Sequence, residues 1–286
     1  MADGFRVVTT TGSRQPGRRA PGSMIGAVPY IFGVCRASAL PGPVLVALLG
    51  DLGLTQSAAK ALVHRVAGYG LLDLTRHGRV GVYRLAGQLR ANFEQLRGAG
   101  ASADWDGRFH VLVYDVPESR RALREAFLSA AARFGYRQLR PGVVVALRDA
   151  SAGLGDLLSA AAAVTGWLDV DASASTRLIE HAWDLPALAG RYGDVISRLD
   201  AIKTAEADPL VAFRSLYEAS SEAYQLLGEE GSLPRVALPE DWPAGRLGEA
   251  LGRVLALLGP AATGHADAVI NASRHAALAE RDPGWG

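Results

Sequence analysis

Side chains suited to binding phosphate gather in one stretch of the chain, between Leu54 and Ala86. They are Thr55, Gln56, Ser57, Lys60, His64, Arg65, Arg76, His77, Arg79 and Arg84. Lysine and arginine displace counterions when they approach nucleic-acid phosphates, and hydroxyl and amide groups hydrogen bond to phosphates or base edges. We therefore expect this stretch to contact duplex DNA, although a solvated basic face that binds another protein would show the same composition.

The same stretch has the local pattern of a helix followed by a hairpin. Thr55 or Ser57 can cap the helix, and apolar residues then recur at helical spacing, at Ala59, Leu62, Val63 and Val66. Lys60 and His64 share another face. Two short apolar runs, 71–74 and 80–85, flank a basic turn, and residues 41–51 precede them as another helix. This order predicts a winged helix-turn-helix over residues 22–98, with one helix in the major groove and the hairpin on the phosphates.

Charge is distributed unevenly along the 286 residues, although the net charge is only +1. Residues 1–100 hold twelve Lys or Arg and four Asp or Glu, a net charge of +8, and the remainder holds 18 and 25, a net charge of −7. A basic first third on an acidic body indicates a nucleic-acid-binding module attached to another unit. Residues 1–21 contribute four of those arginines, three of them between residues 14 and 19, and their Gly, Thr, Arg and Pro content predicts a disordered tail.

The remaining chain predicts a mixed α+β protein with two further units. Residues 105–180 have the order β-α-β-β-α-β of a ferredoxin-like sandwich, with strands at 109–115, 136–139, 143–147 and 166–170 and helices at 120–134 and 154–164. Residues 181–280 predict a helical C-terminal domain, with helices at 185–205, 208–227 and 246–258. From Pro260 the helical pattern resumes as far as residue 278, and a loose tail follows.

Several function classes find no support in the sequence. GxSxG, P-loop, GxGxxG and HExxH patterns are missing, so we expect no catalytic residue, no metal site and no bound cofactor. The single cysteine, Cys35, excludes an internal disulfide and lies in an apolar run typical of a buried thiol. No apolar run reaches the ~18 residues of a membrane helix, and the N-terminus does not resemble a signal peptide. We expect a cytoplasmic protein that does not contact a membrane.

Five blocks, in order, resemble the PaaX-like transcriptional repressors. They are GLLDLTRHGRVGVYRL, WDGRFHVLVYDVPESRRALREAF, FGYRQLRPGVVVA, WDLPALAGRYGDV and LPRVALPEDWPAG, and the resemblance runs from about residue 25 to about 257. The family implies a winged helix, a ferredoxin-like middle, a helical C-terminal domain, and a homodimer that binds operator DNA. It also implies a small-molecule effector, an acyl-CoA in the best-known branch, that releases the DNA.

The effector candidates are aromatic residues and one arginine of the C-terminal part, a composition that suits an anionic or aromatic ligand. They are Trp183, Tyr192, Arg214, Tyr217 and Trp242. Arg214 matches a family arginine, and either a ligand or an ion pair between domains would explain it. The two tryptophans also suit a purely structural place in the helical core.

The chain departs from the family in its hairpin, which has fewer basic and aromatic residues, and at Gly68, where a basic residue is common.

Two hypotheses follow. The first is a ligand-responsive repressor that binds DNA as a dimer. The second is a scaffold recruited as an enzyme or a small-molecule-binding protein, with DNA binding lost. A metal-dependent nuclease would need Asp115, which follows a strand as in related CRISPR-associated proteins, but one acid there is more often a turn residue.

Overall fold

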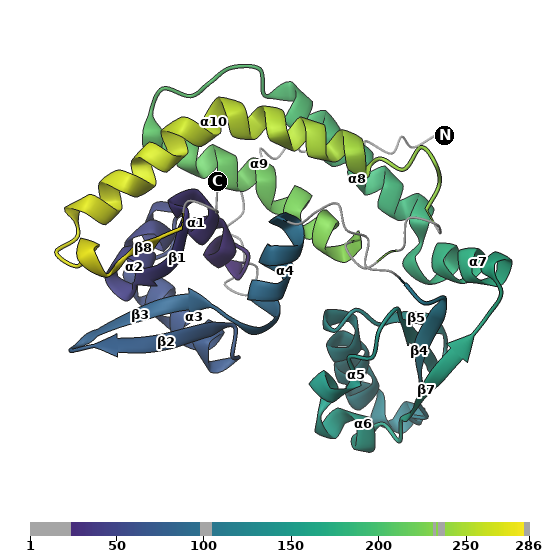
Figure 1. The fold of residues 1–286 in the computed structure, drawn as a ribbon. Coiled ribbons are helices and arrows are strands. Elements are labelled where there is room, and N and C mark those ends of the chain that lie inside the picture. Colours follow the sequence, from purple (N-terminus) through teal and green to yellow (C-terminus); the bar gives the residue numbers. More distant parts are fainter. Residues whose placement is uncertain (1–23, 98–104, 231–232, 234–237, 283–286) are drawn as a thin grey trace, which may run out of the picture.

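The computed structural model describes residues 24–97, 105–230, 233 and 238–282, and the tail expected at 1–21 lies outside this part. The described chain is α+β, with two antiparallel four-stranded sheets and helices around them. Figure 1 shows an N-terminal unit and a middle unit side by side, with the long C-terminal helices running above both.

The N-terminal unit alternates helices with one small sheet. Its helices are α1 (Ala27–Cys35), α2 (Gly42–Asp51), α3 (Gln56–Gly68) and α4 (Gly87–Arg97), and its strands are β1 (Ala37–Pro41), β2 (Leu72–His77) and β3 (Val80–Leu85). The hairpin β2–β3 pairs through β3 with β1. Strand β1 was not predicted, because its sequence ASALP is short and holds no β-branched or aromatic residue.

The middle unit has the predicted order of strands and helices. Its strands are β4 (Arg108–Val113), β5 (Arg137–Arg140), β6 (Val143–Ala146) and β7 (Val164–Asp169), and its helices are α5 (Arg121–Arg133) and α6 (Asp156–Ala160). The sheet order β5-β6-β4-β7 is antiparallel throughout. The helix expected at 154–164 is shorter, because Gly155 (φ 50°) and Ala162 (φ 48°) adopt left-handed backbone on either side of α6.

The C-terminal unit contains helices α7 (Ala172–Trp183), α8 (Leu185–Ala201), α9 (Pro209–Glu230) and α10 (Ala244–Ala272). The helix predicted at 246–258 and the helical pattern predicted from Pro260 form one helix, since α10 continues through that residue. Pro260 is exposed, and Gly259 before it has no Cβ to clash with the proline ring. The tail expected to be loose also forms structure, since β8 (Glu280–Arg281) pairs with β1 of the N-terminal unit.

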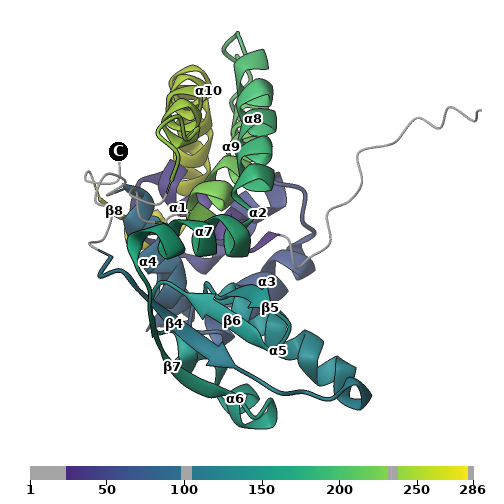
Figure 2. The same ribbon diagram turned by 90° about the vertical axis from the view of Figure 1, so that its right-hand side faces the viewer.

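Two separate hydrophobic cores explain this arrangement. One core joins α1, α2 and α3 to α8, α9 and α10, and Tyr30 and Phe213 meet in it with ring centroids 5.3 Å apart. The Tyr30 hydroxyl donates a hydrogen bond of 2.6 Å to the Phe213 carbonyl, so this buried polar group is satisfied. A second core lies inside the middle unit, around Phe127 and Tyr136. Figure 2 shows α7 between the C-terminal helices and the middle sheet.

None of the helices in the described ranges is both long enough and apolar enough to cross a membrane.

Burial makes Cys35 chemically inert. Desolvation raises the pKa of its thiol to about 12, against the opposing charge of Arg281. At pH 8 only about one thiol in 10,000 would be ionised. We expect Ellman's reagent to react with the protein at the rate of unfolding in native buffer and within seconds in urea. Rapid labelling of the native protein would contradict the buried position.

Candidate functional site

Helix α3 presents one polar face to solvent and one apolar face to the core. Its N-cap, Thr55, accepts a hydrogen bond of 3.3 Å from the Ala58 N–H, as the sequence predicted for one of two candidate caps. The apolar face is buried at Ala59, Leu62, Val63 and Val66. The predicted DNA-binding residues Gln56, Ser57, Lys60 and His64 are all exposed. No other part of the described chain therefore covers the exposed side of α3.

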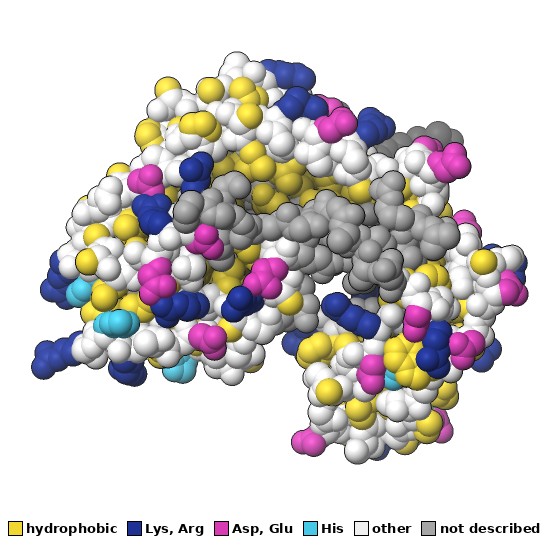
Figure 3. All heavy atoms as spheres, in the orientation of Figure 1, with side chains coloured by type: hydrophobic (Ala, Val, Ile, Leu, Met, Phe, Trp, Pro, Cys, Tyr) yellow, Lys and Arg dark blue, Asp and Glu magenta, His cyan; other side chains and the backbone are white. Residues whose placement is uncertain are grey.

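The hairpin β2–β3 stands out from the N-terminal unit beside α3 (Figure 1). Its strands pair from Leu72 opposite Leu85 to His77 opposite Val80, and Gly78, at φ 61°, lies in the turn. Arg76, His77 and Arg79 are exposed. Figure 3 shows basic and histidine side chains gathered over this hairpin, at the lower left of the view.

Two of the predicted DNA-binding arginines are placed differently from the others. Arg65 is only partly exposed. Arg84 forms an ion pair with Glu280 of β8 and lies 3.5 Å from the Thr75 hydroxyl. A guanidinium already paired with a carboxylate has less charge to offer a phosphate. Lys60, His64, Arg76, His77 and Arg79 are thus exposed on α3 and the neighbouring hairpin, whereas Arg84 is paired with the C-terminal strand.

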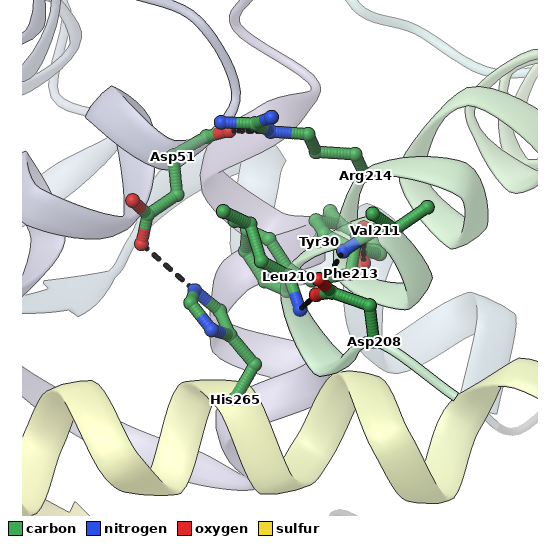
Figure 4. A network of polar contacts seen from close by, with 8 residues as sticks. All are labelled: Tyr30, Asp51, Asp208, Leu210, Val211, Phe213, Arg214 and His265. Atoms are coloured by element: carbon green, nitrogen blue, oxygen red, sulfur yellow. Dashed lines mark hydrogen bonds and ion pairs between the residues drawn. The ribbon is translucent and has the colours of Figure 1, made fainter. Parts of the chain in front are cut away.

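The C-terminal end of α2 is held by two residues of the C-terminal helices (Figure 4). Arg214 of α9 donates from Nε to the Asp51 carbonyl at 2.5 Å. His265 Nε2 of α10 lies 2.8 Å from Asp51 Oδ2, and the histidine ring packs 5.2 Å from the Phe213 ring. Orphan carbonyls at a helix C-terminus favour positively charged partners. These contacts connect α9 and α10 to the helix that directly precedes α3.

The five predicted effector residues do not meet in one pocket. Trp183 and Tyr192 are buried in the helical core, and Tyr217 is buried with its hydroxyl 3.5 Å from the Met24 sulfur. For Arg214 the sequence left open a ligand contact or an ion pair between domains. Arg214 does make a contact between domains, but it donates a hydrogen bond to the Asp51 carbonyl and does not form an ion pair. Trp242 lines a surface cavity between α7, α8 and the segment before α10. No local pattern marks Asp51, His265 or Glu280 in the sequence, because each gains its partner from a distant part of the chain.

The middle unit contains one buried polar cluster. Tyr136 OH lies 2.7 Å from His110 Nδ1 and accepts from the Ala150 N–H at 3.3 Å, and His110 Nε2 lies 3.5 Å from Asp149. Burial raises the pKa of Tyr136 to about 12, and two hydrogen bonds from Ser151 lower the pKa of Asp149. Each polar group has a partner, so the cluster reads as a structural link between β4 and the loop after β6. Within the residues described, no three His, Cys, Asp or Glu side chains group as a metal site would require.

The comparisons with known proteins agree with the middle unit. Residues 102–175 match the family model described as the PaaX protein central Cas2-like domain. The resemblance to the PaaX family found in the sequence is thereby confirmed for this part of the chain. The uncharacterized protein Rv0674 from Mycobacterium tuberculosis is similar with a TM-score of 0.47 and 20% identity, over 79% of this chain and 89% of that chain. No curated protein matches the chain.

The contact between Asp51 and His265 should stabilise the protein measurably. The two side chains are 29% and 16% exposed, so removal of one partner leaves the other partly desolvated without its hydrogen bond. We expect His265→Ala to lower the free energy of unfolding by about 1–3 kcal/mol in urea titrations.

The matched control is His181→Ala, since His181 is an exposed helical histidine, and its effect should stay within about 0.5 kcal/mol. A double-mutant cycle with Asp51→Ala, which removes the acceptor, isolates the pair. Additive effects of the two changes would show that the pair contributes nothing.

Proposed function

We propose that this protein is a ligand-responsive transcriptional regulator, acting as a repressor, that binds operator DNA as a homodimer through α3 and the β2–β3 hairpin. The observation that carries the proposal is the exposure of Lys60, His64, Arg76, His77 and Arg79 on two neighbouring elements, α3 and the β2–β3 hairpin. A polar helix face beside a basic hairpin suits a major groove and its flanking phosphates.

The topology of the N-terminal unit supports this proposal. The order α1-β1-α2-α3-β2-β3, with a sheet β2-β3-β1, is consistent with the proposed winged helix-turn-helix. Four residues, 52–55, join α2 to α3, and Gly53 takes the left-handed φ of 95° in this turn. In this interpretation α3 is the recognition helix and the β2–β3 hairpin is the wing.

A homodimer would place two copies of α3 in successive major grooves, about 34–36 Å apart, and would require a near-palindromic operator. The grip of Arg214 and His265 on Asp51 supports an effector response, because a displacement of α9 or α10 would move the end of α2 and the turn into α3. An effector that prefers the displaced arrangement would lower DNA affinity by its difference in affinity for the two states.

The alternative is a scaffold that no longer binds DNA and acts as an enzyme or a small-molecule-binding protein. The pairing of Arg84 with Glu280 favours it, because this pair removes one cation from a hairpin with few basic residues. The open side of α3 favours the regulator. Incubation with metabolites of the neighbouring genes tests for an enzyme, since only an enzyme would consume one of them, and titration with DNA separates the regulator from a protein that only binds a small molecule.

Charge removal from α3 and the hairpin should weaken DNA binding in a salt-dependent way. We expect Lys60→Ala and Arg79→Ala each to reduce affinity for the promoter beside the protein's own gene several-fold, in gel-shift or anisotropy titrations. Each change should also reduce the slope of log affinity against log salt by about one, the value for one lost phosphate contact.

Arg133→Ala is the matched control, since Arg133 is an exposed arginine of α5 in the middle unit, and affinity should not change. If Arg133→Ala weakens binding as much as Arg79→Ala, the hairpin is not the specific contact, and loss of positive charge anywhere on the protein accounts for the effect. If no upstream fragment gives a salt-sensitive shift with the unaltered protein, the regulator proposal fails.

A further inference from the structure

A surface cavity of about 360 Å³ lies in the C-terminal unit, and no residue of α3 or of the β2–β3 hairpin lines it. Thr176 and Glu180 of α7 form one wall, Leu185 and Pro186 at the start of α8 form another, and Asp241 and Trp242 before α10 form the third. The volume falls within the range of small-molecule sites. Glu180 and Asp241 are exposed, so the cavity opens to solvent.

Trp242 gives this cavity an aromatic wall and an unused donor. Its ring packs 5.7 Å from the ring of the fully buried Tyr192, which holds it in place. Its Nε1 atom is buried and has no hydrogen-bond partner among the described residues. An ammonium group has no lone pair and cannot accept from this N–H, so the face of the ring, and not Nε1, is the surface that Trp242 offers to a cation.

The charge of the cavity walls is negative. Glu180 and Asp241 each supply a full negative charge, and no lysine or arginine of the described chain is among the lining residues. The N-termini of α8 and α10 lie beside the cavity and each contributes roughly half a positive charge. The two carboxylates therefore exceed the two helix ends, and the cavity should attract cations and repel a polyanion such as an acyl-CoA.

We propose that this cavity binds a small organic cation, an amine on a compact aromatic or aliphatic skeleton. The skeleton would pack against Leu185, Pro186 and the face of Trp242, and the ammonium group would lie between Glu180 and Asp241. An indole face adds cation–π attraction to the ammonium. If the protein is the regulator proposed above, this cation is its effector. Binding of the cation does not depend on that function, whereas an effect of the cation on DNA affinity does.

Isothermal titration calorimetry on the full chain, without DNA, tests the proposal with matched pairs of probes. Benzylamine, 2-phenylethylamine and cyclohexylamine are compared with benzoate, phenylacetate and cyclohexanecarboxylate at pH 7, so that skeletons correspond and charges are opposite. We expect at least one amine to bind and its carboxylate partner not to bind. Glu180→Gln and Asp241→Asn should each weaken the amine by about two- to fivefold, the effect of an exposed ion pair.

Glu249→Gln is the matched control, since Glu249 is an exposed acid of α10 outside the cavity, and it should leave amine affinity unchanged. The proposal is overturned if the carboxylates bind as well as the amines, if no amine binds up to about 10 mM, or if Glu249→Gln weakens binding as much as Glu180→Gln. The calorimetric titration contains no DNA, so a negative result there overturns the amine site and does not affect the DNA-binding proposal. In the same way, a missing gel shift overturns DNA binding and does not affect the amine site.

Discussion

The apolar contact between α1 and the C-terminal helices is the constraint on which the arrangement of the chain depends. Tyr30 and Phe213 pack in the centre of this contact, and the hydrogen bond between them satisfies the one polar group that Tyr30 brings into the core. These segments are nearly two hundred residues apart in the sequence, and burial of their apolar surfaces against each other gives them one shared core. As a result, the N-terminal unit is not a module on a flexible linker but is packed onto the helices proposed to sense a ligand.

That shared core explains how the basic residues divide into two groups. Arginines at the contact have partners, as Arg214 has Asp51, Arg84 has Glu280, and Arg281 has Asp267 and the Cys35 carbonyl. Each of these guanidinium groups therefore has a hydrogen-bond or ion-pair partner at the contact. On α3 and the β2–β3 hairpin, Lys60, Arg76 and Arg79 have no ion pair within the described chain and remain exposed. The positive charge of the first third of the sequence is thus partly paired at the contact and partly exposed on α3 and the hairpin.

The middle unit keeps its own core and touches the rest of the chain mainly through α7. Helix α7 directly follows β7, packs near β5, and carries Glu180 into the wall of the cavity. A ligand in that cavity would contact α7, α8 and the segment before α10 together. Because α10 also carries His265, which contacts Asp51, the cavity and α3 are connected through packed helices and one polar contact. This route is a physical path for coupling, and its strength depends on how differently a ligand binds two arrangements of these helices.

The sequence determined the features that depend on neighbours in the chain. Apolar spacing defined α3 and its buried face, Thr55 supplied the cap, and alternating strands and helices gave the order of the middle unit, because periodicity and capping are local. Only the tertiary structure decided what depends on distant segments. Strand β1 exists because β3 and β8 pair with it, α10 passes through Pro260 because packing on α9 outweighs one lost hydrogen bond, and Arg84 meets Glu280 across 196 positions. The gathering of Trp242, Glu180 and Asp241 around one cavity has the same cause, since no spacing in the sequence encodes a meeting of three separate segments.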